Sequence, residues 1–258
     1  MFIKDLVQEI QQLNKPYDQI RIIVPSKRAI KYIKEELASH ITTPTFSPDI
    51  LTISDWVKEN SPYGFAKPLE LLIELFEVHL SLDNESNQTF DQFFNWGKSL
   101  IADFDEIDRY LVNPDEIYRD LRNIKEIENW SFNEDELSSG QTSFLEFWLK
   151  LKDYYSEFNK RLTAKGICYA GNAFKKLALA PTQLNPDNRF VVFAGFNALS
   201  LAEEQIMRYF IQQKQGKVIW DTDQLYWENS YHEAGHFIKK FYYIRIRVGF
   251  IFFWFSSY

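Results

Sequence analysis

The sequence predicts an α/β fold that is interrupted by a large all-helical insertion. Short β-like runs alternate with helical patterns near both ends of the 258-residue chain, whereas apolar residues in its middle recur at helical spacing. The predicted segments are a first α/β part over residues 1–64, a helical insertion over 65–185 and a second α/β part over 186–240, followed by an atypical tail over 241–258.

The composition is that of an ordinary soluble globular protein, with 45% hydrophobic and 25% charged residues. A net charge of −7 argues against a protein that coats nucleic acid by bulk attraction, but it permits a local basic patch. Cys168 is the single cysteine, which excludes an internal disulfide and a multi-cysteine metal site. The charged N-terminus lacks the apolar core of a signal peptide, and no apolar run is long enough to span a bilayer. We therefore expect a cytoplasmic protein without a membrane partner.

The first α/β part begins with an apolar helical stripe over residues 2–13. The run RIIV at 21–24 predicts a strand, and a helix follows over 25–37. A second β-like run, ILTI at 50–53, leads into a helix that starts near Ser54. Strands that alternate with helices in this way are typical of α/β proteins.

The insertion contains three long stripes of apolar residues at helical spacing, and a further helix start. Asn113, Pro114 and Glu116 supply a cap, a proline at the first helical position and an acidic residue in the first turn. The three stripes are Leu69, Leu72, Ile73, Phe76 and Leu80; Phe93, Leu100, Ile101, Phe104, Ile107 and Leu111; and Phe144, Phe147, Trp148, Leu151, Tyr155, Phe158 and Leu162.

The second α/β part contains two strand-like runs, FVVF at 190–193 and KVIW at 217–220. Between them, Ser200 and Glu203 form the pattern of a capping box that opens a helix. The tail over 241–258 holds nine aromatic residues and almost no helix or turn signals. It is interpreted as an artefact of truncation or, alternatively, as a C-terminal edge strand.

Two segments raise the question of phosphate binding. Gly97, Lys98 and Ser99 match the end of a P-loop, but Gln92 stands where its first glycine belongs, and the triplet lies within a helical stripe. Residues 26–28 are better placed, because they follow a strand and open a helix. Backbone amides and the cations of Lys27 and Arg28 converge there with Ser26, which suits a phosphate of a nucleic-acid backbone. The alternative is an ordinary capped surface helix.

Two groups of acidic residues are interpreted as solvent-facing. Asp221 and Asp223 follow the run KVIW, where metal or acid–base groups are common, but no partner is visible in the sequence. We expect these two residues in a solvated turn. A second group falls on one helical segment and is expected on its solvated face; its members are Asp103, Asp105, Glu106 and Asp108.

The pentapeptide HEAGH at 232–236 matches the zinc-protease pattern H-E-x-x-H. On a helix, His232 and His236 would share a zinc ion, and Glu233 would activate water. A third ligand is needed, yet the 22 residues that follow contain no His, Asp, Glu or Cys. We therefore expect no metal here, and a zinc metallopeptidase remains the alternative function.

Several segments together resemble one family, the AddB-like proteins of the PD-(D/E)XK nuclease family, over residues 2–240. The most specific are FFNWGKSLIADFDEIDRYLV at 93–112 and FVVFAGFNALSLAEEQIM at 190–207; the others are VPSKRAIKYIKEEL at 24–37, PDILTISDWVKE at 48–59 and VIWDTDQLYW at 218–227. In this family a segment similar to E-A-G-x-F follows the last of these, which offers another explanation for residues 233–237.

The resemblance implies a helicase-like (RecA-like) α/β domain with an inserted helical subdomain, in a protein that processes DNA double-strand breaks. It also implies a lost motor, since no Walker A loop precedes the first strand and Ala194 stands at the degenerate Walker B position. The acidic residues and the Mg²⁺ of the nuclease belong to a missing downstream domain, so we expect this stretch to be a non-catalytic fragment without a cofactor. Its expected partners are single-stranded DNA, bound weakly, and an AddA-like helicase subunit. A protein-interaction module without a DNA role is the third hypothesis.

Overall fold

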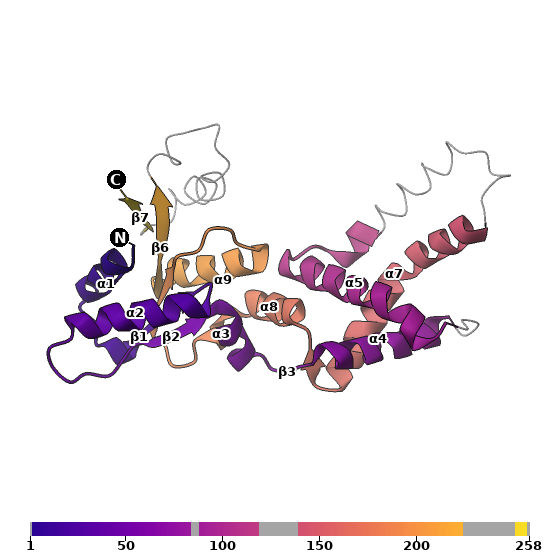
Figure 1. Ribbon diagram of the computed structural model, residues 1–258, viewed down its shortest axis with the longest axis horizontal. Coiled ribbons are helices and arrows are strands. Elements are labelled where there is room, and N and C mark those ends of the chain that lie inside the picture. The colour runs from indigo at the N-terminus through magenta and orange to yellow at the C-terminus, as the bar shows by residue number, and fades with distance from the viewer. Residues whose placement is uncertain (1, 84–87, 119–138, 224–250, 257–258) are drawn as a thin grey trace. The chain divides into compact units, whose positions relative to one another are not determined.

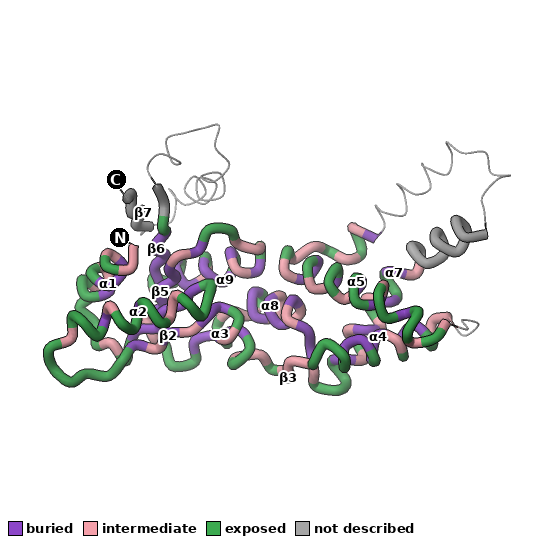
Figure 2. Tube along the Cα trace, in the orientation of Figure 1, coloured by how far each residue is buried: buried purple, intermediate pink, exposed green. Residues whose placement is uncertain are grey.

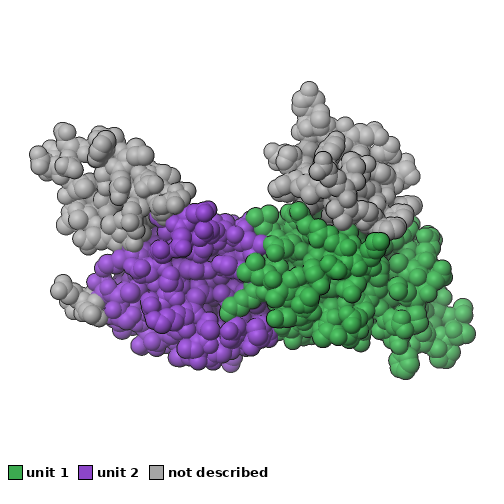
Figure 3. Space-filling model, turned by 180° about the vertical axis from the view of Figure 1, so that it is seen from behind, with its two compact units in different colours: residues 1–60, 176–258 green, residues 61–175 purple. Residues whose placement is uncertain are grey.

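The computed structural model describes residues 2–83, 88–118, 139–223 and 251–256 (Figure 1). The chain forms two compact units, which Figure 3 shows in different colours. The first unit consists of residues 1–60 and 176–258, and the second consists of residues 61–175. The second unit is thus inserted in sequence between the two parts of the first.

The first unit is built on a five-stranded parallel sheet in the order β2-β1-β5-β6-β7. This finding confirms the predicted α/β class. The strands are β1 (Ile20–Val24), β2 (Asp49–Thr52), β5 (Phe190–Ala194), β6 (Gly216–Asp223) and β7 (Ile251–Ser256). All five residues of β1 are buried, as expected for a strand that is covered on both faces.

Helices cover both faces of this sheet (Figure 1). On one face, α1 (Phe2–Gln12) and α2 (Lys27–His40) pack their apolar residues against β1, β2 and β5. On the other face, α3 (Ile53–Asn60) and α9 (Leu201–Gln212) meet the sheet through three aromatic rings. Trp56 lies 6.0 Å from Phe193 and 5.6 Å from Phe210 between ring centroids. The central strands β1, β5 and β6 are mostly buried, whereas α1 and α2 keep an exposed outer side (Figure 2).

The order of the strands creates a switch point between β1 and β5. The chain leaves β1 into α2 on one face, and it leaves the neighbouring strand β5 toward α9 on the other face. In doubly wound sheets, ligands bind outside the carboxyl ends of the strands where the connections diverge in this way. The segment with Ser26 starts at this point, directly after β1.

The second unit consists mainly of helices, in the described part α4 (Pro68–Leu82), α5 (Phe90–Arg109), α7 (Ser139–Ala164) and the start of α8 (Ala170–Leu179). Residues 114–118 are helical as predicted, and the N–H of Asp115 donates to Oδ1 of Asn113 at 3.0 Å. The unit is not all-helical, however, because β3 (Gly64–Phe65) pairs in parallel with β4 (Ile167–Cys168). Strands of two residues are too short to show a period of two, so the sequence pattern missed them.

One expectation for the C-terminal part is corrected. Asp221 and Asp223 do not lie in a turn, because β6 continues through Asp223. The strand extends this far since residues 251–256 pair with it in parallel, from Val218↔Ile251 to Asp223↔Ser256. Residues 251–256 of the tail form an edge strand, β7, in agreement with the second of its two interpretations. The described part of the first unit also contains the short 3₁₀ helices η1 (Tyr17–Gln19) and η3 (Pro181–Leu184).

Candidate functional site

The start of α2 is an exposed helix N-terminus without a side-chain cap. Ser26 occupies the N-cap position with extended backbone angles (φ −143°, ψ 150°), but its hydroxyl makes no capping hydrogen bond. The corresponding residue of α9 behaves differently, since Oγ of Ser200 accepts from the N–H of Glu203. The first amides of α2 thus keep their donors available to an acceptor from outside the helix.

Two cations accompany these amides. The side chain of Lys27 is 80% exposed, and Arg28 is also exposed. One carboxylate lies close by, because Oδ2 of Asp55 is 3.7 Å from Nζ of Lys27. Asp55 is held by Thr52, whose hydroxyl donates to Oδ2 at 2.8 Å and accepts from the N–H of Asp55 at 3.0 Å. The site therefore carries a small net positive charge and suits one phosphate better than several.

The carboxyl end of the neighbouring strand, β5, offers backbone groups to a ligand but no charged side chain. Ala194, the predicted degenerate Walker B position, is the last residue of β5 and is buried. Gly195 follows with a φ of +72°, a backbone conformation that residues with a Cβ rarely adopt, and its N–H donates to the carbonyl of Ile219 at 3.2 Å. A methyl group at this strand end offers nothing that binds a metal ion or activates water.

The zinc hypothesis concerns His232, Glu233 and His236, which lie outside the described residues. Within residues 2–83, 88–118, 139–223 and 251–256, no group of three or more His, Cys, Asp or Glu side chains is arranged to hold a metal ion. Helices of the described part also lack the combined length and apolarity that a membrane span requires.

The predicted solvated face of the acidic cluster on α5 is confirmed for Asp103 and Glu106, which are exposed, and is wrong for Asp108. Asp108 is fully buried rather than on a solvated face. Its oxygens accept hydrogen bonds from the hydroxyls of Tyr155 and Tyr169, both at 2.5 Å, and from Nζ of Lys175 at 2.8 Å. Burial, together with the Asp108 carboxylate, raises the pKa of both tyrosines well above 10. The phenols therefore remain protonated donors at neutral pH.

A second acid of this cluster is engaged as well. Asp105 accepts from the backbone N–H of Gly171 at the start of α8 and from Nε of Arg109 at 2.6 Å. A Cβ at position 171 would lie 2.2 Å from the carbonyl oxygen of Asp105, so this close approach requires glycine. Asp108 follows Phe104 by four residues, which places it on the buried stripe of α5, and this spacing was the signal that could have revealed it. The acids connect α5, α7 and α8 and have a structural role.

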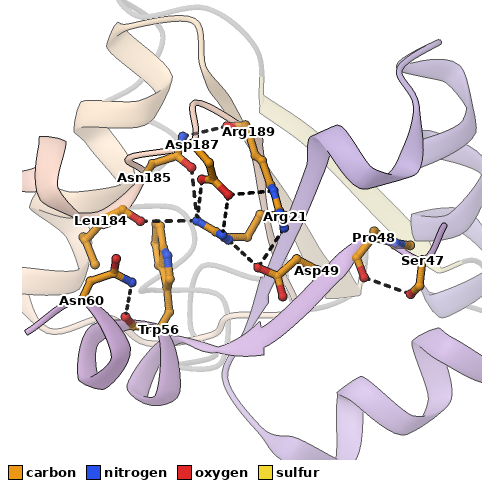
Figure 4. A network of polar contacts seen from close by, with 10 residues as sticks. All are labelled: Arg21, Ser47, Pro48, Asp49, Trp56, Asn60, Leu184, Asn185, Asp187 and Arg189. Carbon is orange, nitrogen blue, oxygen red and sulfur yellow. Dashed lines mark hydrogen bonds and ion pairs between the residues drawn. The ribbon is translucent and has the colours of Figure 1, made fainter.

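A charge network closes the opposite edge of the sheet, at the amino ends of the strands (Figure 4). Arg21 is buried on β1, and it donates to Asp49 on β2 at 2.8 Å and to Asp187 at 3.2 and 3.3 Å. Arg189 binds the same two carboxylates, at 3.3 and 2.8 Å. Every charge in this network has an opposite partner, so the network fixes β1, β2 and the segment before β5.

Comparison with known protein families and with curated proteins gives no match for this chain. Assignment of a function therefore rests on the residues and on the geometry of the two units.

Proposed function

We propose that this chain is a non-catalytic, helicase-like scaffold of an AddB-like nuclease-family protein, and that it contacts a backbone phosphate of single-stranded DNA at the start of α2. The role would be to hold the strand during processing of DNA breaks, next to a helicase partner. Support comes from the resemblance of five segments to that family, from the parallel sheet of the first unit and from the insertion of a mainly helical unit between its two parts.

The observation that carries the proposal is the uncapped N-terminus of α2 at the switch point between β1 and β5. Its amides have no side-chain acceptor, Lys27 and Arg28 are exposed beside them, and sheet topology favours ligand binding at this edge. One bound phosphate would accept hydrogen bonds from the first amides of α2 and would pair with the cations of Lys27 and Arg28. Phosphate contacts of this type position a strand without reading its sequence.

A motor function is not supported. ATP hydrolysis needs a loop that surrounds the β- and γ-phosphates and a carboxylate that holds Mg²⁺ through water. The sequence contains no G-x-x-x-x-G-K-[ST] motif, and Ala194 ends β5 with a methyl group. The developing charge of the transferred phosphoryl group would therefore lack its main electrostatic support.

The test uses the fluorescence anisotropy of a labelled single-stranded oligonucleotide in about 50 mM salt, where phosphate contacts are poorly screened. Lys27→Glu with Arg28→Glu changes the local charge by four units and should abolish binding. Lys31→Glu with Lys34→Glu is the matched control, since it makes the same change on exposed positions of α2 beyond its first turn. The control should retain most of the affinity.

Each outcome discriminates between the hypotheses. Equal affinity of the wild type and the Lys27/Arg28 variant removes this site, and absence of binding by the wild type favours the interaction module. The zinc alternative is tested by measuring the zinc content of the purified protein. About one equivalent of zinc that is lost in His236→Ala would favour the zinc metallopeptidase over the scaffold.

A further inference from the structure

Helix α4 of the second unit packs into the core of the unit through Leu71, Leu72, Leu75 and Val78. It also exposes apolar side chains, namely Leu69, Ile73 and Leu80, which are 56%, 45% and 37% exposed, beside the exposed carboxylates of Glu70 and Glu77. Apolar surface left in water costs about 25 cal/mol per Å², so these apolar side chains favour a partner that covers them.

The exposed side of α4 forms a groove with α5. The groove has a volume of about 450 Å³ and is lined by Pro68, Leu69, Leu71, Leu72, Phe94, Lys98 and Ile101. Phe94 is 40% exposed. The apolar residues that line the groove lie at helical intervals, three residues apart on α4 (Leu69 and Leu72) and seven apart on α5 (Phe94 and the partly buried Ile101). Two neighbouring helical ridges of this kind form a seam into which a third helix packs.

Among the described residues that line the groove, the one charged side chain is cationic. Lys98 is exposed, and no ion pair forms at Lys98 within the part of the chain that the structure describes. The described lining is therefore apolar apart from one positive charge, and its complement is an apolar stripe that carries a negative charge.

We propose that this groove binds an amphipathic helix of a protein partner, with an acidic residue beside its apolar stripe that pairs with Lys98. A second copy of this chain fits less well, because a two-fold contact through the groove would bring the two Lys98 ammonium groups toward each other. Binding of this partner helix does not depend on the proposed DNA contact, because the groove lies on α4 and α5 of the second unit and the DNA contact lies at the start of α2.

The test uses two designed helical peptides of about 18 residues, which correspond to five turns. Both carry Leu or Ile at every third and fourth position; one has Glu beside this stripe, and the other has Lys at the same places. Fluorescence anisotropy should show that the wild type prefers the Glu peptide by about tenfold. Lys98→Glu should reverse the preference, and Leu69→Ser with Phe94→Ser should weaken binding of both peptides by about tenfold or more.

Two controls keep the result specific. Leu179→Ser removes an apolar side chain of comparable exposure (67%) on α8, and Lys160→Glu reverses an exposed charge on α7; neither should change the affinity or the preference. Circular dichroism checks that each variant is folded. If Leu69→Ser with Phe94→Ser does not fold, Lys98→Glu still tests the proposal, because it leaves the apolar surface intact. Equal affinity for the two peptides overturns the proposal. A second outcome also overturns the proposal. If the wild type self-associates and Leu69→Ser with Phe94→Ser abolishes this self-association, the occupant of the groove is a second copy of the chain.

Discussion

Asp108 shows how a single residue organises the second unit. A carboxylate without solvent is costly unless donors surround it, and here two phenols, an ammonium group and the amide of Asn172 at 3.4 Å face its oxygens. The donors come from α7, from the residue that follows β4 and from α8. The geometry around one side chain therefore fixes how three segments meet α5.

Removing the cation of this group tests that view. Lys175→Met leaves the Asp108 carboxylate buried without its ion-pair partner and should lower the free energy of unfolding by about 2 kcal/mol, less than for a fully buried pair because Lys175 is partly exposed. Asp108→Asn with Lys175→Met removes both charges and should regain part of the loss. Urea unfolding of the two single variants and the double variant measures the coupling, and strictly additive effects would contradict it.

At the scale of the element, the two serines at helix starts make a matched pair. Ser200 caps α9 through its side chain and also meets the carboxylate of Glu203 at 2.9 Å, whereas Ser26 makes no capping hydrogen bond at α2. Ser200→Ala should therefore cost about 1 kcal/mol of stability, and Ser26→Ala should cost less than about 0.5 kcal/mol. Thermal or urea unfolding compares them. A large loss for Ser26→Ala would show that its hydroxyl already serves the helix.

The packing of α4 on α7 depends on pH through His79. Its Nδ1 lies 2.7 Å from the hydroxyl of Tyr154, whose pKa burial raises to about 12, so that the phenol remains a donor. Burial lowers the pKa of His79 below 6.5; the carboxylate of Asp83 opposes this shift, and Lys150 acts in the same direction as burial. The unfolded chain therefore binds this proton more readily than the folded chain, and stability must fall as the pH drops below 6.5.

Melting temperatures measured between about pH 7.5 and pH 5.5 test whether the stability of the fold depends on a neutral His79. The wild type should lose stability on acidification, and His79→Gln should lose less, although its stability at neutral pH is lower. Identical profiles for the wild type and His79→Gln would exclude His79 as the source.

The elements with a clear period were predictable from the sequence, and the connections between distant side chains were not. The runs RIIV and FVVF predicted β1 and β5 within one residue, because buried parallel strands are continuously apolar. The place of Ser26 between a strand and a helix was predicted correctly, and phosphate binding there stays a prediction. Asp108 was misinterpreted because its donors lie 47 to 67 residues later in the chain. The groove on α4 was missed because exposure of an apolar residue depends on which neighbours pack beside it.

At the scale of the whole molecule, net charge and local charge have opposite signs. The chain carries −7, while the start of α2 presents two exposed cations with one carboxylate nearby. In the proposed complex with DNA, a short-range contact would therefore have to overcome the long-range repulsion between the two molecules. Such a contact leaves a measurable signature in the salt dependence of binding, because each neutralised phosphate releases a fixed amount of counterion.

The number of phosphate contacts follows from that signature. For single strands, the slope of log K against log salt is about −0.7 for each neutralised phosphate, so the proposed contact of Lys27 and Arg28 with one phosphate predicts a slope of about −0.7. Lys27→Ala with Arg28→Ala should bring the slope close to zero, since no cation remains at the start of α2. Lys31→Ala should leave the wild-type slope unchanged because Lys31 lies outside the first turn of α2. Anisotropy titrations from about 20 to 150 mM salt give these slopes. A wild-type slope steeper than about −4 would require several more cations along the strand and would contradict binding through the start of α2 alone.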